Sequence, residues 1–535
     1  MTQRAAVVGS GPNGLTAACE LARAGWQVTV YEAAETPGGA ARSAELFGPG
    51  VISDLGASVH PLSMASPAYQ SLLAAGDVDW AQPPIPAAHG LDGAAPALLH
   101  SSLEQTAEGL GRDGDLWRWV IGPLVNNWDE VHRAILTPPS RPFSDDGAGL
   151  RRVGALLQIG SVGAMPAKNL MRSFRTEGAR ALLSGLAAHT TAPLSYPLTA
   201  AVGLAFGAAA HAQGWPVVRG GTQKLVDALL AVLTRHGGQI QTGFRVTGVH
   251  KVPVPQVHGE RRKLGARKRR AGHQFRIEGA DGPGSSSGRS DSSTSHGGSG
   301  PLRTASETAD AVVLDLTPAQ LLHLEGLDLG PRARRALRRW DYGPGVVKID
   351  YLLNGPIPWQ HSELAGAGTV HLGGSGEQVA ASEAAANRGV LPGRPYVLVA
   401  QPSAADPTRT PDGRTVCWAY AHVPNGLDSS GVARAVRLIE EELRRQAPDF
   451  ADAVLGRRVW GPADLQEWNP NLVGGSVSGG VASLRQTVAG PLSALRPYSA
   501  GVDGVYMCSS AAPPGGGAHG TNGYHAARAV LRELS

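Results

Sequence analysis

Cysteine is scarce in this sequence. The 535 residues include three cysteines, Cys19, Cys417 and Cys508, and these lie far apart. They form no C-x-x-C pair and show no spacing typical of metal ligands, so the sequence predicts neither a dithiol redox centre nor a metal site. The odd number argues against a disulfide framework and favours a reducing compartment.

Charge and long apolar runs are also limited. Charged residues make up 17% of the chain, the formal net charge is +4, and the sequence has no apolar run of about 18 residues that would predict a membrane span. Much of the basic excess falls within residues 261–270, so the pI near 9.0 does not indicate a nucleic-acid partner. The N-terminus lacks a signal-peptide pattern. We therefore expect a cytoplasmic protein, and peripheral contact with a membrane stays open.

The N-terminal residues show the pattern of a strand, a helix and a second strand. Residues 4–9 form an apolar run, an Ala- and Leu-rich stretch continues to residue 24, and residues 26–32 are rich in β-branched side chains. Between the first strand and the helix, Gly9-Ser10-Gly11-Pro12-Asn13-Gly14 matches G-x-G-x-x-G. These glycines permit a tight turn, close approach of a pyrophosphate and close helix–strand packing. Glu32, followed by Ala33, can accept hydrogen bonds from ribose hydroxyls. The sequence therefore predicts a dinucleotide site.

A second glycine pair decides between the two common dinucleotides. The segment Gly38-Gly39-Ala40-Ala41-Arg42 follows shortly after Glu32. An NAD domain needs no such loop, whereas the longer FAD needs a second approach to its pyrophosphate and ribityl chain. FAD is therefore the predicted cofactor. The sequence offers no second NAD(P) domain, which argues against a disulfide-reductase mechanism.

Composition divides the rest of the chain. Residues 71–214 carry Leu, Ala and Trp at helical spacing, residues 346–480 mix strand and helix patterns, and residues 251–306 include basic and Ser/Gly-rich stretches. We predict an α/β (α+β) protein whose Rossmann-like FAD-binding domain comprises residues 1–70, 215–345 and 481–535. Within it, residues 251–306 form an extended low-complexity insertion. A discontinuous, largely helical substrate domain is predicted from residues 71–214 and 346–480.

Several motifs together resemble the phytoene desaturase family, within the larger amine-oxidase-like superfamily of FAD proteins. The resemblance rests on the two glycine motifs, Glu32, and the C-terminal loop Pro514-Gly515-Gly516-Gly517-Ala518-His519-Gly520. Two further motifs narrow it to the subgroup of pyridine nucleotide-disulfide oxidoreductase domain-containing proteins: Gly214-Trp215-Pro216-x-x-Arg219-Gly220-Gly221 and Asp406-Pro407-Thr408-Arg409-Thr410-Pro411. It spans nearly the whole chain apart from residues 251–306.

The resemblance implies a set of FAD contacts. The first glycine turn would face the pyrophosphate, Glu32 the adenosine ribose, and Arg42 the phosphates or the ribityl chain. The backbone of Val246 would touch the adenine. At the other end, the resemblance implies Ser509 and Ser510 at the ribityl-phosphate end, and Gly520 and Thr521 at the isoalloxazine. The segment 509–513 departs from the Gly-Ala-x-Thr-His that relatives often have, so its side-chain contacts are not carried over.

The predicted activity is that of an FAD-dependent dehydrogenase or desaturase. A hydride would pass from an apolar, polyene or lipid-like substrate to flavin N5, and oxygen or a quinone would reoxidise the flavin. A flavin amine oxidase and a non-catalytic FAD protein that acts through partners remain alternatives. The sequence leaves the electron acceptor, the direction of reaction and the oligomeric state open.

Histidines and aromatic residues supply the remaining candidates. His60 and His519 lie in segments expected near the flavin and are weak candidates for catalysis, with a structural role favoured for each. His189 and His211 flank an Ala-rich helical stretch, which favours helix packing. Trp418-x-Tyr420-x-His422 would share one face of a strand, either as a pocket wall or as core.

Overall fold

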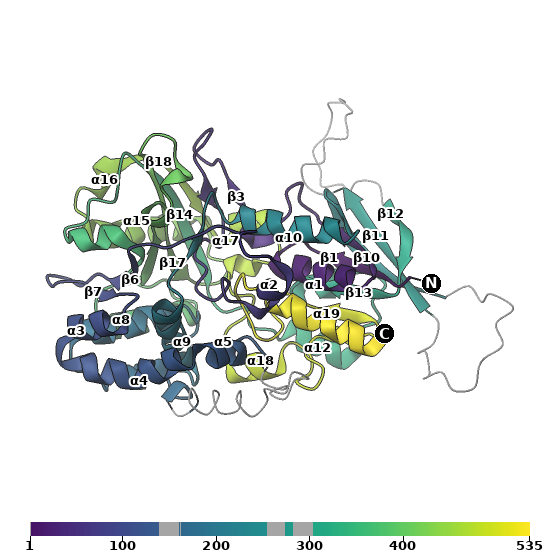
Figure 1. The fold of residues 1–535 in the computed structure, drawn as a ribbon, viewed down its shortest axis with the longest axis horizontal. Coiled ribbons are helices and arrows are strands. Elements are labelled where there is room, and N and C mark those ends of the chain that lie inside the picture. Colours follow the sequence, from purple (N-terminus) through teal and green to yellow (C-terminus); the bar gives the residue numbers. More distant parts are fainter. Residues whose placement is uncertain (1, 139–159, 161, 254–272, 282–302, 535) are drawn as a thin grey trace.

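The computed structural model describes residues 2–138, 160, 162–253, 273–281 and 303–534, which form two lobes side by side (Figure 1). One lobe contains a parallel five-stranded sheet in the order β19 (Val505–Met507), β13 (Ala311–Leu314), β1 (Arg4–Val8), β2 (Gln27–Tyr31) and β9 (Gln239–Gln241). Both faces of a parallel sheet are covered, which is why its strands are continuous apolar runs. This sheet is the expected Rossmann-like core.

Alternate residues of these strands pack against different layers. Ala5 and Val7 face the helices α1 (Pro12–Arg23), α10 (Gln223–Arg235) and α19 (Thr521–Leu534). Ala6 and Val8 face the antiparallel sheet of β10 (Phe244–Pro253), β11 (His273–Asp281) and β12 (Arg303–Ala309). The helices α2 (Pro67–Leu72), α11 (Pro318–His323) and α12 (Pro331–Arg338) complete this lobe.

The second lobe contains a mixed seven-stranded sheet. Its order is β18 (Val454–Trp460), β14 (Gly345–Leu353), β17 (Thr415–Val423), β16 (Val397–Ala400), β15 (Ala367–Leu372), β6 (Ile85–His89) and β7 (Ala97–Leu99). The short strands β3 (Ser43–Ala44) and β4 (Ser53–Asp54) form one pair, and β5 (Trp80–Ala81) and β8 (Val217–Val218) form another.

Helices cover both faces of the seven-stranded sheet (Figure 1). On one side lie α3 (Leu103–Gly109), α4 (Gly114–Asn126), α5 (Trp128–Ile135), α7 (Ala167–Met171), α8 (Glu177–Ala188), α9 (Thr199–Ala212) and α13 (Gly376–Asn387). On the other side lie α15 (Ser429–Gln446) and α16 (Phe450–Ala453). The short helices α14 (Pro402–Ala405), α17 (Pro462–Trp468) and α18 (Leu484–Ala489) lie in connecting segments.

The strand register places a row of side chains across the seven-stranded sheet. His89 pairs with His371, His371 with Leu398, Leu398 with Tyr420, and Tyr420 with Lys348. Paired residues point to the same face of a sheet. This row therefore lies on one face, which forms part of the site described below.

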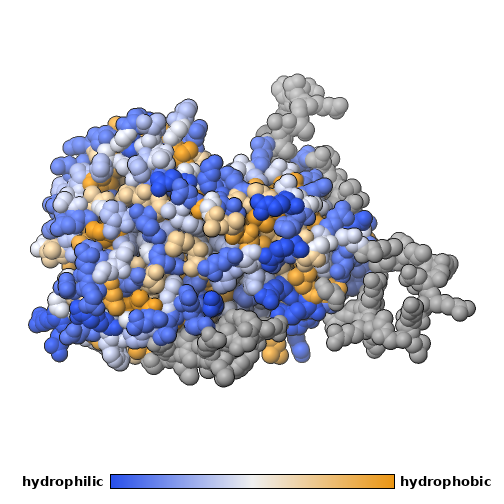
Figure 2. Space-filling view, viewed as in Figure 1, coloured by the Kyte–Doolittle hydropathy of each residue, from blue (hydrophilic) through white to orange (hydrophobic). Residues whose placement is uncertain are grey.

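The division into two domains and their limits stay predictions. The basic stretch and the Ser/Gly-rich stretch of the 251–306 insertion fall on residues 254–272 and 282–302, outside the described residues. On the face shown in Figure 2, apolar side chains are scattered between polar ones. Within the described ranges, each helix is too short or too polar to cross a bilayer.

Candidate functional site

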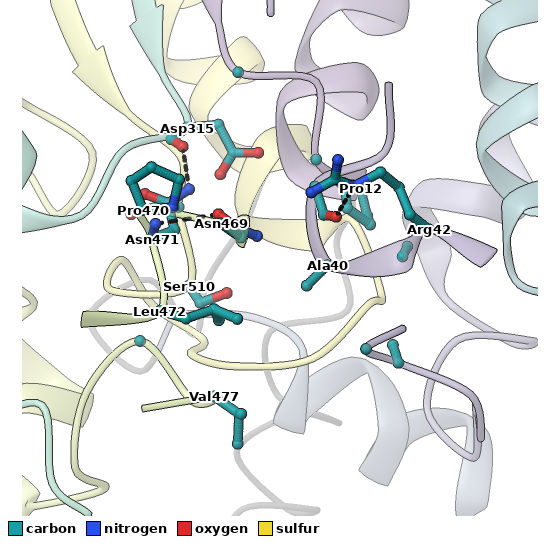
Figure 3. A pocket seen from close by; sticks show the side chains of 18 of the residues that line it. Pro12, Ala40, Arg42, Asp315, Asn469, Pro470, Asn471, Leu472, Val477 and Ser510 are labelled. Carbon is teal, nitrogen blue, oxygen red and sulfur yellow. Dashed lines mark hydrogen bonds between the residues drawn. The ribbon is translucent and has the colours of Figure 1, made fainter. Parts of the chain in front are cut away.

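A cavity of about 790 Å³ lies between the two lobes. Its lining begins at the turn between β1 and α1, continues along the ends of β2 and β10, and reaches the aromatic face of the seven-stranded sheet. Figure 3 shows Pro12, Ala40 and Arg42 on one side of the cavity and the segment 469–472 on the other. The two glycine motifs therefore line the same cavity as residues of the seven-stranded sheet, although they lie far from those strands in the sequence.

The first glycine motif leaves no room for larger residues. A Cβ on Gly14 would lie 2.1 Å from the carbonyl oxygen of Gly9, and a Cβ on Gly11 would lie 2.6 Å from Asp315 Oδ2. Gly9 has a φ of +97°, which favours glycine. Helix α1 begins immediately after the turn, at Pro12, so its free N–H groups and positive dipole end face the cavity.

Glu32 lies at the end of β2 and is tied to the same turn. Its Oε2 accepts hydrogen bonds from Ser10 N at 2.8 Å and from Ser10 Oγ at 2.5 Å, and its Oε1 accepts one from Ala34 N. Ser10 Oγ also accepts a hydrogen bond from Gly38 N. Glu32, Ala33 and Ser10 all line the cavity. These bonds fix the carboxylate where a ribose of a bound dinucleotide would lie.

The second glycine motif packs directly on the first. A Cβ on Gly39 would lie 2.9 Å from Gly11 Cα. Arg42 donates to Gly39 O at 2.9 Å and to Trp468 O at 3.0 Å, and its guanidinium lies over the Trp468 ring. Burial lowers the pKa of Arg42 from its ordinary value, and the nearby Glu32 opposes this shift. An arginine held this way places a fixed positive charge at the wall of the cavity.

Asp315 is a site residue that sequence reasoning missed. It follows β13, lines the cavity, and accepts a hydrogen bond from Gly14 N at 3.1 Å. Burial raises the pKa of this carboxyl to about 7; the Gly14 N–H opposes the shift and the charge of Glu32 adds to it. A single acidic residue at the end of an apolar strand was the available signal.

Some of the remaining residues predicted to contact FAD line the cavity, and others do not. Val246, Ser509 and Ser510 line the cavity together with Gly9, Gly11, Pro12, Asn13, Gly39 and Ala40. Gly14, Gly38, Gly520 and Thr521 are not among the residues that line the cavity. Gly517 and Ala518 line the cavity ahead of Gly520 and Thr521, and α19 begins at Thr521. The individual FAD contacts stay predictions.

The two histidines proposed for catalysis are both buried away from the described lining of the cavity. His60 Nε2 lies 3.0 Å from Thr222 Oγ1, and burial lowers the pKa of His60 to about 4. His519 Nδ1 lies 2.7 Å from Thr521 Oγ1, and burial lowers its pKa to about 4 as well. Both arrangements are those of hydrogen-bonded structural histidines.

The far end of the cavity is aromatic. Trp418 and Tyr420 of β17 line it and are stacked, with ring centroids 5.6 Å apart and an interplanar angle of 8°. Phe206 of α9 and Trp215 line the same end, and their rings lie 5.7 Å apart. Trp418 and Tyr420 therefore form part of the pocket wall, which is one of the two interpretations of the Trp418-x-Tyr420-x-His422 pattern. His422 is not among the lining residues, and its Nδ1 lies 2.8 Å from Glu383 Oε2.

Lys348 and His189 were not identified as cavity residues. Lys348 of β14 lies in the lining, and its Nζ donates to Asp350 Oδ1 at 2.5 Å and to Asp54 O at 3.2 Å. A lysine followed two residues later by an aspartate in an otherwise apolar strand was the signal in sequence. His189 also lines the cavity, whereas His211 bonds Trp117 Nε1 in the helical layer as expected.

The site fits a bound dinucleotide. Its glycine turns are closed to any Cβ, a helix N-terminus follows the first of them, and Arg42 supplies positive charge. Asn13 Oδ1 and Ser509 Oγ, on lining residues, are buried with no hydrogen-bond partner in the part of the chain described, as groups that contact a ligand often are. No cluster of His, Cys, Asp and Glu that could hold a metal ion occurs among the described residues.

Comparisons with known proteins agree with this geometry. The NAD(P)-binding Rossmann-like domain matches residues 7–75. Over 99% of its length the chain is 26% identical to pyridine nucleotide-disulfide oxidoreductase domain-containing protein 2 from Rattus norvegicus, and it covers 93% of that protein. A putrescine oxidase variant has a TM-score of 0.58 at 14% identity, with 100% of both chains covered. Cyclohexylamine oxidase from Brevibacterium oxydans IH-35A has a TM-score of 0.54 at 14% identity, covering 100% of this chain and 99% of that one.

Fold and site together define a Rossmann-containing protein with the fold of the putrescine and cyclohexylamine oxidases. The predicted fold class is therefore confirmed. The chain is a homologue of pyridine nucleotide-disulfide oxidoreductase domain-containing protein 2, as the sequence motifs indicated. The family match agrees with the predicted dinucleotide site, and the name of this relative agrees with the predicted oxidoreductase class.

Proposed function

We propose that the protein is an FAD-dependent oxidoreductase of the dehydrogenase or desaturase type, acting on an apolar, uncharged substrate. The observation that carries this proposal is the single cavity that joins the glycine turns to an aromatic wall on the second lobe. A cofactor held at one end of such a cavity would meet a substrate held at the other. Oxygen or a quinone would serve as electron acceptor, and a cytoplasmic location with peripheral membrane contact left open remains our expectation.

Residues of the first lobe would hold the cofactor. The glycine turn and the start of α1 would bind the pyrophosphate, Glu32 the ribose, and Arg42 the phosphates or ribityl chain. Bound FAD would supply the hydride acceptor, flavin N5.

Residues of the second lobe would bind and orient the substrate. Among the described lining residues, no acidic side chain belongs to α9 or to strands β14, β15, β16 and β17. Lys348 also lines this wall, and its charge is paired with the carboxylate of Asp350, which does not line the cavity. A buried charged amine would therefore find no unpaired carboxylate among these lining residues, which is unfavourable. The wall therefore favours an uncharged molecule that packs on the aromatic rings.

An amine substrate is the second candidate, because the fold is that of putrescine and cyclohexylamine oxidases. A pair of aromatic rings facing each other across the site would favour this candidate. Trp418 and Tyr420 instead stack on one another along one strand, so they form one wall. A non-catalytic role for bound FAD is the third candidate.

Anaerobic reduction of the flavin-loaded protein distinguishes these candidates. We expect a neutral lipid extract to bleach the flavin absorption and putrescine or cyclohexylamine to leave it unchanged. Bleaching by the amines alone would replace the proposed substrate class with the second candidate. If neither reduces the flavin, the non-catalytic role is favoured.

A further inference from the structure

Two buried histidines and a third, half-buried one connect the cavity to the interior of the second lobe. His89 and His371 are register partners on β6 and β15, and both are fully buried. His189, at the end of α8, lies above them, with its Nε2 3.0 Å from His371 Nε2. Burial lowers the pKa of His89 to about 4 and of His189 to about 3, and lowers that of His371 well below its ordinary value. All three rings are therefore neutral near pH 7.

The hydrogen bond of His89 to a carbonyl fixes the position of its proton, and the contacts between the rings favour one arrangement for His371 and His189. His89 Nε2 lies 2.9 Å from Gly374 O, and a carbonyl can only accept, so His89 Nδ1 has the lone pair. His89 Nδ1 and His371 Nδ1 lie 2.9 and 2.5 Å from the point where a Cβ on Gly185 would lie. Both Nδ1 atoms are buried without a hydrogen-bond partner among the described residues, and two lone pairs so close to one point would repel, which favours the proton of His371 on Nδ1. His371 Nε2 then accepts from His189 Nε2–H.

This arrangement leaves the lone pair of His189 on Nδ1. His189 lines the cavity, and among the described residues its Nδ1 has no hydrogen-bond partner and is not a buried atom. Its ring packs against Phe206, with centroids 4.8 Å apart. At this end of the cavity Lys348 donates and the Tyr420 hydroxyl can do either, whereas His189 Nδ1 can only accept.

We propose that His189 recognises a hydroxyl group on the substrate. The hydroxyl donates its hydrogen bond to His189 Nδ1, and the apolar body of the same molecule lies against Phe206 and Trp418. This inference rests on the proposed function, in which the aromatic end of the cavity holds the substrate. It narrows the substrate class to uncharged alcohols with a large apolar portion.

Binding of two matched probes to the FAD-loaded protein tests this role without turnover. Decanol carries a hydroxyl donor, whereas decyl methyl ether has a similar tail and an oxygen that can only accept. Dissociation constants from isothermal titration calorimetry are expected to favour decanol by about 3- to 10-fold, the usual range for one neutral hydrogen bond. His189→Phe should abolish this preference while the affinity for the ether stays unchanged.

Two further variants keep the result specific. His189→Asn restores an acceptor oxygen and should recover part of the preference, while His211→Phe alters a histidine that bonds Trp117 in the helical layer and should retain all of it. Equal binding of both probes by the unmodified protein, or a preference that survives His189→Phe, overturns the inference but not the proposed function. A flavin-loaded protein that binds neither probe contradicts the apolar substrate site, and the inference with it. A protein that holds no FAD contradicts the proposed function itself.

Discussion

Asp315 should make FAD binding depend on pH. Its carboxyl lies beneath the glycine turn, where Oδ2 accepts a hydrogen bond from Gly14 N and the residue faces the cavity. When protonated, the carboxyl can donate its second oxygen's proton to a phosphate; when ionised, it would repel the pyrophosphate. Asp315→Asn keeps an acceptor for Gly14 and replaces the acid proton with an amide N–H, so this variant mimics the protonated form at every pH.

The magnitude follows from the pKa of Asp315, which burial raises from 3.8 to about 7. If FAD binds only the protonated form, affinity should fall about tenfold between pH 6 and pH 8, or about 1.4 kcal/mol. The sign for folding is the same, because the folded pKa lies above the unfolded one. Stability from the protonated carboxyl is complete below about pH 4 and is lost as pH rises through about 7, up to about 4 kcal/mol in all.

Quenching of flavin fluorescence during titration measures this affinity at pH 6, 7 and 8. The affinity of the unmodified protein for FAD should fall as the pH rises, whereas the affinity of Asp315→Asn should stay nearly constant. Asp115→Asn, which changes a carboxylate whose side chain is 99% exposed, is the matched control and should follow the unmodified protein. An identical pH dependence in Asp315→Asn and the unmodified protein would show that Asp315 does not cause the pH dependence of FAD binding.

Three other substitutions test separate parts of the site. Gly14→Ala should weaken FAD binding by about 100-fold, because its Cβ would meet a backbone oxygen at 2.1 Å, while Gly330→Ala, with open space around it, should bind FAD normally; equal affinities would contradict this. Arg409→Met should lower the free energy of unfolding, measured in urea, by about 3–5 kcal/mol. The substitution leaves the buried carboxylates of Asp54 and Asp406 without their ion-pair partner. The exposed Arg434→Met is its control, and equal losses would count against a buried ion network. Lys348→Met should lower the free energy of unfolding by about 3–5 kcal/mol, because it leaves the buried Asp350 carboxylate without its ion-pair partner, and an unchanged free energy would contradict this.

Local patterns were sufficient to predict the ends of the chain. The apolar run at 4–9, the glycine turn and Gly25 after the helix match β1 and α1, since each element is specified by neighbouring residues. Residues 524–534 have the apolar spacing of a helix, and α19 covers them and begins three residues earlier, at Thr521. Within the helical pattern of 71–214, residues 115–135 lie in two helices, α4 and α5, which meet at Asn127.

Long-range pairing limited the prediction of the substrate end. His89 and His371 become neighbours because β6 pairs with β15, strands separated by more than half of the chain, and no local pattern specifies that register. His189 therefore read as an ordinary helix-packing residue, although its ring reaches the cavity. Asp315 was missed for a related reason: its contact with Gly14 joins residues 301 positions apart.

The cofactor content of the purified protein is the most direct test of whether the protein binds FAD. The protein is prepared without added flavin, its visible absorption is recorded, and any released cofactor is identified by chromatography. We expect a yellow protein that releases one FAD for each protein chain. A colourless protein that also fails to take up added FAD would contradict it.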